Sequence, residues 1–339
     1  IENLKIIGPQ SEGAQLEGSK LFAKNFMKRH NIPTANFKSF TKEEPQQAIC
    51  YLKTSSPPFV IKANGLASGK GVFICNTLNE ALAAIDDILV KSKFGESGST
   101  IVIESFLTGI ELSVFILTDG HSYKILPSAK DYKRIGDGDT GLNTGGMGAV
   151  SPVTFLDERL MEKIKLKIIE PTLFGLKKEN IEYKGFLFFG LIRVGDEPFV
   201  IEYNVRLGDP ETQTIIPRIQ SDLLKLLLKI NSSENFEKCK INISDQATAT
   251  VILSSGGYPE KFQKGHLIQG MNKVKDSLLF HAGLKSKNAQ LITNGGRVLA
   301  ITSFGKTLAE ATKKSYINTN KIQFKNAYFR KDIGADLII

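Results

Sequence analysis

The spacing of apolar residues along this chain predicts a mixed α/β (α+β) protein. Between residues 17 and 30, Leu21, Phe22, Phe26 and Met27 recur at helical spacing, and the pattern ends before Pro33. Similar patterns predict helices near 42–54, 78–91, 157–178, 211–230 and 307–319. Runs rich in β-branched and aromatic residues predict strands at 59–61, 72–74, 100–103, 112–117, 122–126, 186–194, 198–204 and 247–253. The opening Leu4-Lys-Ile-Ile7 has the pattern of the last strand of a domain whose beginning is missing.

A glycine-rich segment, Lys62 to Gly71 (KANGLASGKG), separates the strands at 59–61 and 72–74. Its glycines allow backbone N–H groups to converge on an oxyanion, and its two lysines add positive charge. It is not a Walker A loop, because Gly71 stands in place of the Ser or Thr and a strand follows instead of a helix. We therefore expect a strand–loop–strand hairpin that binds phosphate, with a plain flexible hairpin as the alternative.

The segment 130–150 holds six glycines within the thirteen positions 136–148, with charged residues between them. Loops this long are usually functional or disordered. Strong strand and helix patterns on either side favour a functional loop, and the residues after Asp137 lack the spacing of a calcium-binding EF-hand. We expect an unstructured loop that closes over a substrate.

The strand at 198–204 carries polar residues on one side. Strict alternation places Phe199, Ile201 and Tyr203 on one face and Val200, Glu202, Asn204 and Arg206 on the other. Carboxylate and amide oxygens suit Mg²⁺, and a guanidinium can hold a phosphate or a carboxylate. The alternative is an ordinary half-exposed strand with a surface ion pair.

Composition and charge narrow the function classes. With 339 residues, 41% hydrophobic and 23% charged, the chain is long enough for two or three domains. The net charge of +9 could indicate nucleic acid, but the lysines are scattered, with only doublets such as Lys177-Lys178. A basic surface around an anionic substrate is the preferred interpretation, and no nucleic-acid partner is expected.

Cysteine and histidine usage gives no sign of a metal or disulfide framework. Cys50, Cys75 and Cys239 lie far apart, which favours a reducing, cytoplasmic location. The longest apolar stretch, 186–192, is too short to span a bilayer, so no membrane partner is expected. The four histidines lack metal-ligand spacing and no Gly-x-Ser-x-Gly elbow occurs, which argues against zinc and serine hydrolases.

Together, these motifs resemble the ATP-grasp superfamily and, within it, the phosphoribosylamine–glycine ligase family. The segments that carry the resemblance are 16–20, 62–71, 131–134, 137–149, 201–213, 294–298 and 330–334. The resemblance implies an ATP-grasp fold with a central (A) subdomain at 16–38 and 111–243 and a B subdomain at 39–110. It also implies a C-terminal mixed-sheet lid domain at 244–339, with 1–15 as the tail of the family's Rossmann-like N-terminal domain.

The resemblance also implies roles for individual residues. Lys20 and Lys62 match the lysines that bind the ATP phosphates, and Gly65, Ser68, Gly69, Lys70 and Gly71 belong to the loop that covers the triphosphate. Glu104, Phe106 and Leu107 match the hinge that reads the adenine edge, and Glu111 matches the carboxylate that grips the ribose. Glu202 and Asn204 would hold Mg²⁺ or Mn²⁺ and act with Arg206 in catalysis. Substrate contacts are expected from Asp131, Lys133, Arg134, Asp139, Asn143, Gly145 and Arg297.

The implied reaction joins glycine to 5-phospho-D-ribosylamine through glycyl phosphate, with Mg²⁺-ATP as co-substrate, and gives glycinamide ribonucleotide, ADP and phosphate. This is a step of purine biosynthesis, and a monomer is expected. Three alternatives stay open at this point: an ATP-grasp ligase acting on another carboxylate and amine, a nucleotide-sensing protein without catalysis, and a nucleic-acid binder.

Overall fold

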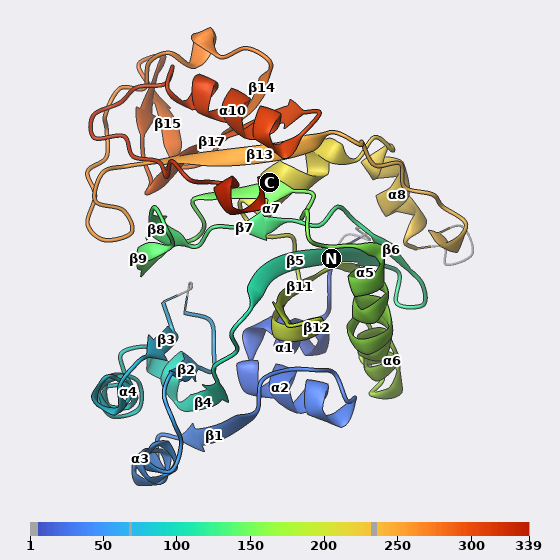
Figure 1. Cartoon of the computed structure of the whole chain (residues 1–339), viewed down its shortest axis with the longest axis vertical. Coiled ribbons are helices and arrows are strands. Elements are labelled where there is room, and N and C mark those ends of the chain that lie inside the picture. Colours follow the sequence, from blue (N-terminus) through green and yellow to red (C-terminus); the bar gives the residue numbers. More distant parts are fainter. Residues whose placement is uncertain (1–5, 68–69, 232–235, 339) are drawn as a thin grey trace.

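The computed structural model describes residues 6–67, 70–231 and 236–338. Figure 1 shows three groups of strands, each with its own helices, and the C-terminal group lies at the top of the view. The described residues form a mixed α/β fold, as the sequence predicts. The strand predicted over 4–7 falls partly on residues outside the described ranges, and Ile6 and Ile7 belong to no strand.

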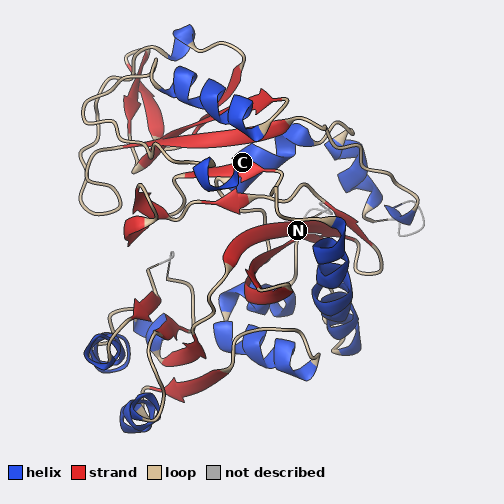
Figure 2. Cartoon of the chain, in the orientation of Figure 1, coloured by secondary structure: helices blue, strands red, loops and turns tan. Residues whose placement is uncertain are grey.

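The first group is an antiparallel sheet in the order β1-β4-β2-β3. Its strands are β1 (Phe37–Thr41), β2 (Phe59–Ala63), β3 (Val72–Cys75) and β4 (Thr100–Ser105). Helices α3 (Pro45–Lys53) and α4 (Leu78–Ile85) share one buried core with the sheet, and Figure 2 shows both beside its strands. The predicted hairpin is confirmed, with Lys62 paired opposite Val72.

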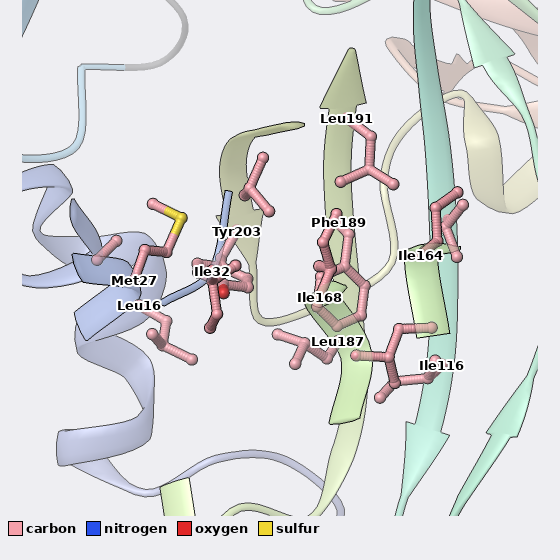
Figure 3. Close-up of a cluster of buried hydrophobic side chains, with 14 of the residues drawn as sticks. Leu16, Met27, Ile32, Ile116, Ile164, Ile168, Leu187, Phe189, Leu191 and Tyr203 are labelled. Carbon is pink, nitrogen blue, oxygen red and sulfur yellow. The ribbon is translucent and has the colours of Figure 1, made fainter. Parts of the chain in front are cut away.

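The second group is a sheet in the order β12-β11-β5-β6. It contains β5 (Ile110–Thr118), β6 (Tyr123–Ile125), β11 (Gly185–Val194) and β12 (Glu197–Asn204), as predicted. Helices α1 (Ser11–Gly18), α2 (Lys20–Arg29), α5 (Glu158–Ile164) and α6 (Glu170–Lys178) accompany the sheet. Figure 3 shows Leu16 and Met27 on one side of Phe189 and Ile164 on the other, so helices from distant segments close one core.

The third group is a five-stranded sheet in the order β14-β17-β13-β10-β7. Three strands come from the C-terminal part: β13 (Ala247–Ser254), β14 (Ser277–His281) and β17 (Arg297–Gly305). The helix α10 (Leu308–Thr319) packs its buried residues on this sheet, as the sequence predicts. A hairpin of β15 (Leu284–Lys287) and β16 (Gln290–Thr293) stands apart from the sheet.

The other two strands of this sheet come from the segment 130–150, for which the prediction of an unstructured loop is wrong. It contains β7 (Lys130–Asp131), β8 (Arg134–Gly136), β9 (Thr140–Asn143) and β10 (Gly148–Ser151). Strands β8 and β9 pair with each other, whereas β10 pairs with β7 and β13. These strands are too short to show a period, and β13, the partner of β10, lies about a hundred residues away in sequence.

Two predicted helices are interrupted. The helix expected over 17–30 is split at Ser19, which ends α1 and caps α2 by accepting a hydrogen bond from the Phe22 N–H at 3.1 Å. The helix expected over 211–230 becomes α7 (Glu211–Ile215), a 3₁₀ turn at Ile216–Arg218 and α8 (Leu223–Lys229). Pro217 explains this break, because proline has no N–H to continue the ladder. Within the described ranges, no helix has both the length and the apolar character that a bilayer crossing needs.

Candidate active site

The polar face of β12 is set by a β-bulge that strict alternation did not predict. Gly190 of β11 pairs with Glu202, but the next residue, Leu191, pairs with Val200, so Ile201 is the extra residue. As a result Val200 and Tyr203 both enter the core, and Val200 does not share a face with Glu202. The prediction for Val200 is wrong, whereas Glu202 and Asn204 still lie on the strand that faces the lysines described below.

The Glu202 carboxylate is free to take a cation. Among the described residues, no hydrogen bond or ion pair engages it. Gly190, opposite, leaves space for this side chain, because a Cβ there would lie 3.1 Å from Glu202 Cγ. No group of three or more acidic, histidine or cysteine side chains in the described ranges could hold a metal by itself. Asn204 Oδ1 accepts a long hydrogen bond from Arg206 Nη2 at 3.4 Å. Glu202 and Asn204 are oxygen ligands of the kind that Mg²⁺ takes, since it completes its shell with water and phosphate oxygens, and their role as its ligands stays a prediction.

The break at Ser19 positions Lys20. Ser19 donates to Asn64 Oδ1 at 3.0 Å, and Lys20 Nζ donates to the Gly65 carbonyl at 3.0 Å. Burial lowers the pKa of Lys20, although Glu202 opposes this shift. The first residue of α2 is thereby fixed at the start of the glycine-rich turn, where the resemblance places a phosphate lysine.

The described part of the glycine-rich segment 62–71, called the glycine-rich turn below, packs against the 3₁₀ turn at 95–98. Gly65 N–H donates to the Ser97 carbonyl at 2.9 Å, and a Cβ on Gly65 would lie 2.8 Å from Ser97 Cα. Lys70 N–H donates to the Ala67 carbonyl at 2.9 Å, and Gly71 packs against Ala67. The predicted residues Ser68 and Gly69 lie outside the described ranges.

Three charged side chains meet where β2 and β4 face α2. Lys62 Nζ lies 2.9 Å from Glu104 Oε1, and Lys24 Nζ lies 2.8 Å from Glu104 Oε2. Burial raises the pKa of Glu104, but Lys62 and Lys24 outweigh that effect and hold it below its usual range. The Glu104 carboxylate, predicted to help read the adenine edge, is thus engaged by two lysines. Lys24 was not predicted, because nothing in a helical pattern distinguishes a buried lysine from a surface one.

The segment after β4 contains the remaining residues of the predicted nucleotide hinge. Phe106 is exposed and Leu107 is half-buried, so both are accessible to a ligand. Glu111, at the start of β5, pairs with Lys133 Nζ at 2.8 Å, and this charge lowers the pKa of Glu111. The structure thus brings Lys133 from the 130–150 segment to the carboxylate predicted to grip the ribose.

Two acidic side chains lie beyond Lys133. Asp131 Oδ2 is 4.0 Å from Lys133 Nζ, and burial raises the pKa of Asp131. Burial, reinforced by the charge of Asp131, raises the pKa of Glu211 to about 8. Glu211 is buried and was not predicted as a site residue, although it belongs to the segment 201–213 that carries the family resemblance.

Arg206 is held by an acidic residue of α1. Its Nη2 lies 2.9 Å from Glu17 Oε1, and Glu17 Oε2 accepts the Val205 N–H at 2.9 Å. Arg206 remains 57% exposed. Glu17 was not predicted, yet an acidic residue in the last turn of a helix opposes the helix dipole, and this is a sequence signal for a tertiary partner. The substrate role of Arg206 stays a prediction.

Arg297, predicted to contact substrate, binds several protein groups, and its contact with substrate stays a prediction. Its Nη1 donates to the Gly145 carbonyl at 2.6 Å and to the Asp209 carbonyl at 2.9 Å, and its Nη2 pairs with Asp209 Oδ2 at 2.9 Å. Gly145 N–H donates to the Tyr258 hydroxyl at 3.0 Å. Gly146 has φ +107°, and a Cβ there would lie 2.5 Å from Pro210. We use the name loop clamp for the contacts that Arg297 and Tyr258 make with residues 145–146 and with Asp209.

The β8–β9 hairpin is attached to the C-terminal part through Arg330, which is 1% exposed. Arg330 Nη1 lies 2.7 Å from Asp139 Oδ1, and Arg330 Nη2 lies 2.6 Å from Asp332 Oδ2. The carboxylate of Asp139, predicted to bind substrate, is therefore engaged by Arg330. Arg134 Nη1 donates to the Gly141 carbonyl at 2.8 Å, and Arg134 pairs with Asn143 across the hairpin.

Comparisons with known proteins match nearly the whole chain. Residues 18–212 match the family model described as phosphoribosylglycinamide synthetase, ATP-grasp (A) domain, and residues 248–336 match the C domain of the same family. Phosphoribosylamine–glycine ligase of Fusobacterium nucleatum is 44% identical over 98% of this chain and 78% of its own length. The enzyme of the same name from Escherichia coli strain K12 is 45% identical, over 98% of this chain and 77% of its own length.

A relative with a longer chain is the bifunctional purine biosynthetic protein PUR2,5 of Pichia angusta, 46% identical over 98% of this chain. The chain spans 42% of that relative's length. The crystal structure of phosphoribosylamine–glycine ligase from Thermotoga maritima has a TM-score of 0.88 and 38% identity, and the match covers 98% of this chain and 83% of that one. Biotin carboxylase of Campylobacter jejuni, with 15% identity and a TM-score of 0.70 over 96% of this chain and 71% of its own, shares the fold alone.

Proposed function

The chain belongs to the phosphoribosylglycinamide synthetase family of ATP-grasp proteins, and we propose that it ligates glycine to 5-phospho-D-ribosylamine with ATP. One observation carries this proposal beyond the family name. Lys62 Nζ lies 3.5 Å from the Ile201 carbonyl, directly before Glu202, which supports a site where Lys62 would bind phosphate and Glu202 would bind a cation. This arrangement suits the polyphosphate of ATP with its metal ion.

ATP would lie between the first two groups of strands. Lys20 and Lys62 would contact its phosphates, because both ammonium groups lie close to the glycine-rich turn or to β12. Phe106 and Leu107 would pack on the adenine, and Glu111 would accept hydrogen bonds from the ribose hydroxyls. Glu202 and Asn204 would hold Mg²⁺ or Mn²⁺, which when bound neutralises charge on the transferred phosphoryl group.

The chemistry then needs positioning more than a protein nucleophile. A glycine carboxylate oxygen attacks the γ-phosphorus of ATP, the bond to the β-phosphate oxygen breaks, and ADP leaves. The amine of 5-phospho-D-ribosylamine attacks the carbonyl carbon of the resulting glycyl phosphate, phosphate departs with the bonding electrons, and the amine loses a proton. Arg206 and Lys133 supply positive charge near the glycine carboxylate, while the loop clamp fixes the backbone beside it.

The proposal is tested by ADP release with Mg²⁺-ATP, glycine and hydroxylamine, which replaces the ribosylamine as nucleophile. We expect glycine-dependent ADP and glycyl hydroxamate. Glu202→Gln and Asn204→Ala should each lower this turnover by about 100-fold or more, because the cation contact acts on the transferred charge. The matched control is Glu197→Gln, at the other end of β12, where the side chain pairs with surface lysines.

Two results would contradict the proposal. One is ADP release that another amino acid stimulates and glycine does not, which would point to a different carboxylate. The other is unchanged turnover in Glu202→Gln with the fold intact by circular dichroism, which would remove the metal-binding role of β12. ATP bound without turnover in an assay with authentic 5-phospho-D-ribosylamine would favour a nucleotide-sensing protein.

A further inference from the structure

Three buried charged side chains lie between α2 and the first sheet, and their charges do not sum to zero. Lys24, Lys62 and Glu104 have side chains that are 2%, 6% and 5% exposed. The core of this sheet uses Phe59, Ile61, Ile101 and Ile103, so strand alternation places Lys62 and Glu104 on the opposite face. On that face Glu104 pairs with Lys24 of α2. Two ammonium groups share one carboxylate, which leaves one net positive charge.

Lys24 is fixed in this cluster on all sides. Besides Glu104, its Nζ donates to Thr34 Oγ1 at 2.7 Å, and that hydroxyl donates to the Val200 carbonyl at 2.7 Å. Its Nζ also lies 5.9 Å from the centre of the Phe37 ring. At 2% exposure it is not available to a ligand. Burial lowers the pKa of Lys24 to about 8, which leaves it mostly protonated at pH 7.

Lys62 is bound less completely. Its Nζ is paired with Glu104, and its other described contact is the long one of 3.5 Å to the Ile201 carbonyl. It also lies at the end of β2, next to the glycine-rich turn. An ammonium has three donors, so Lys62 keeps capacity for a further oxygen while it remains near Glu104.

We propose that Lys24 is a positioning residue: it neutralises Glu104 so that Lys62 can bind a nucleotide phosphate. This inference rests on the proposed function for the nucleotide alone. Without Lys24, Lys62 would be the single cation on a buried carboxylate, and drawing it toward a phosphate would leave Glu104 uncompensated, which is costly. With Lys24 present, the carboxylate keeps a partner and the cluster keeps a positive charge for the phosphate.

The test is a double-mutant cycle read by calorimetric binding of Mg²⁺-ATP to the protein. Lys24→Met should raise the ATP Kd about tenfold or more. Removing the carboxylate as well, in Lys24→Met/Glu104→Gln, should recover at least threefold of that loss. Inorganic triphosphate should show the same pattern, since the effect acts on phosphate. Lys28→Met, an exposed lysine on the same helix, is the matched control with unchanged Kd.

A direct contact of Glu104 with the nucleotide predicts the opposite change in the ATP Kd of the double variant. If its carboxylate reads the adenine, the double variant should bind ATP more weakly than Lys24→Met, and that result would overturn the proposal. An unchanged Kd in Lys24→Met would do the same. If Lys24→Met does not fold, the comparison is Glu104→Gln with the double variant: equal Kd values support the proposal, and a tenfold difference refutes it. Because binding is measured without glycine, a failure of the ligase assay is distinguishable from a failure here.

Discussion

The two ends of the site use basic residues in opposite ways. At the nucleotide end, Lys24 and Lys62 share the buried Glu104 carboxylate and Lys20 binds the Gly65 carbonyl, so ammonium donors remain for a ligand. At the other end, Arg297 and Arg330 each bind several carboxylate and carbonyl oxygens of the protein itself. The first arrangement leaves positive charge for a ligand, whereas the second uses its charge on the fold.

This difference follows from the chemistry of the arginine and lysine side chains. A guanidinium presents donors in a rigid planar fork and stays charged when buried, so it suits the joining of several protein segments. An ammonium is a compact charge whose pKa changes readily with burial, as Lys20 and Lys24 show. A basic residue in a family motif is therefore not evidence of ligand contact until its donors have been accounted for.

The largest expected effect is on stability and comes from removing Arg330, which binds oxygens of the protein itself. Arg330→Met should lower the free energy of unfolding by about 3 kcal/mol, since it removes a buried guanidinium that binds Asp139, Asp332 and the Arg134 carbonyl. Urea denaturation measures this loss. Arg193→Met, whose surface pair with Asp196 is exposed, is the control and should cost under about 1 kcal/mol. Equal losses in the two variants would show that the Arg330 network is no stronger than a surface pair.

A second test uses the pH dependence of stability. Glu211 is a buried carboxylate for which the described ranges contain no ion pair. Because the folded pKa of Glu211 is raised to about 8, the folded state holds a proton that the unfolded state releases above about pH 4.5. Stability contributed by this group therefore falls as pH rises from about 4.5 to 8. Glu211→Gln should flatten that fall, by up to a few kcal/mol at about 1.4 kcal/mol per pKa unit.

Thermal unfolding of Glu211→Gln at intervals between pH 5 and pH 8 checks this expectation. The control is Glu158→Gln, an exposed acidic residue in the first turn of α5, which should leave the pH profile as it is. A Glu211→Gln profile as steep as that of the unmodified chain would mean that Asp131 carries the pH dependence instead.

At the nucleotide end, Lys62→Met should weaken ATP about 10- to 100-fold, the usual range for a lost hydrogen bond to a charged group. The same variant should leave the binding of glycine unchanged, because its contacts lie on the nucleotide side. Lys53→Met, at the exposed end of α3, serves as control. An ATP Kd in Lys62→Met that equals the control would remove Lys62 from the phosphate site.

The smallest effect is expected in the loop clamp. Arg297→Lys keeps the charge but not the fork, so we expect kcat to fall about tenfold with the ATP Kd within about twofold. Tyr258→Phe removes one hydrogen-bond acceptor and should cost about 1 kcal/mol of stability. A rise in the KM for glycine with unchanged kcat would instead support direct contact of Arg297 with substrate.

Much of this fold is predictable because its longer elements are strongly periodic. The hairpin at 59–75, the pair β11–β12 and the helix α10 follow from local pattern, and Glu202 and Asn204 follow from one strand and its residue types. The bulge at Ile201 could not be predicted, since it depends on how β11 pairs. Lys24 and the loop clamp could not be predicted either, because each acts through a partner more than 60 residues away in sequence.

The pairing of β10 with β13 also determines when the site can form during synthesis. Residues 134–146 are complete early, but the residues that hold them, Tyr258, Arg297 and Arg330, follow up to about 190 positions later. Such distant contacts are slow to form, because loop closure must precede them. Until β13 emerges from the ribosome, β10 has one edge without its partner, and an open strand edge invites pairing with another chain. The segment 130–150, which contributes to the candidate site in the finished protein, is thus a point of vulnerability to aggregation in the nascent one.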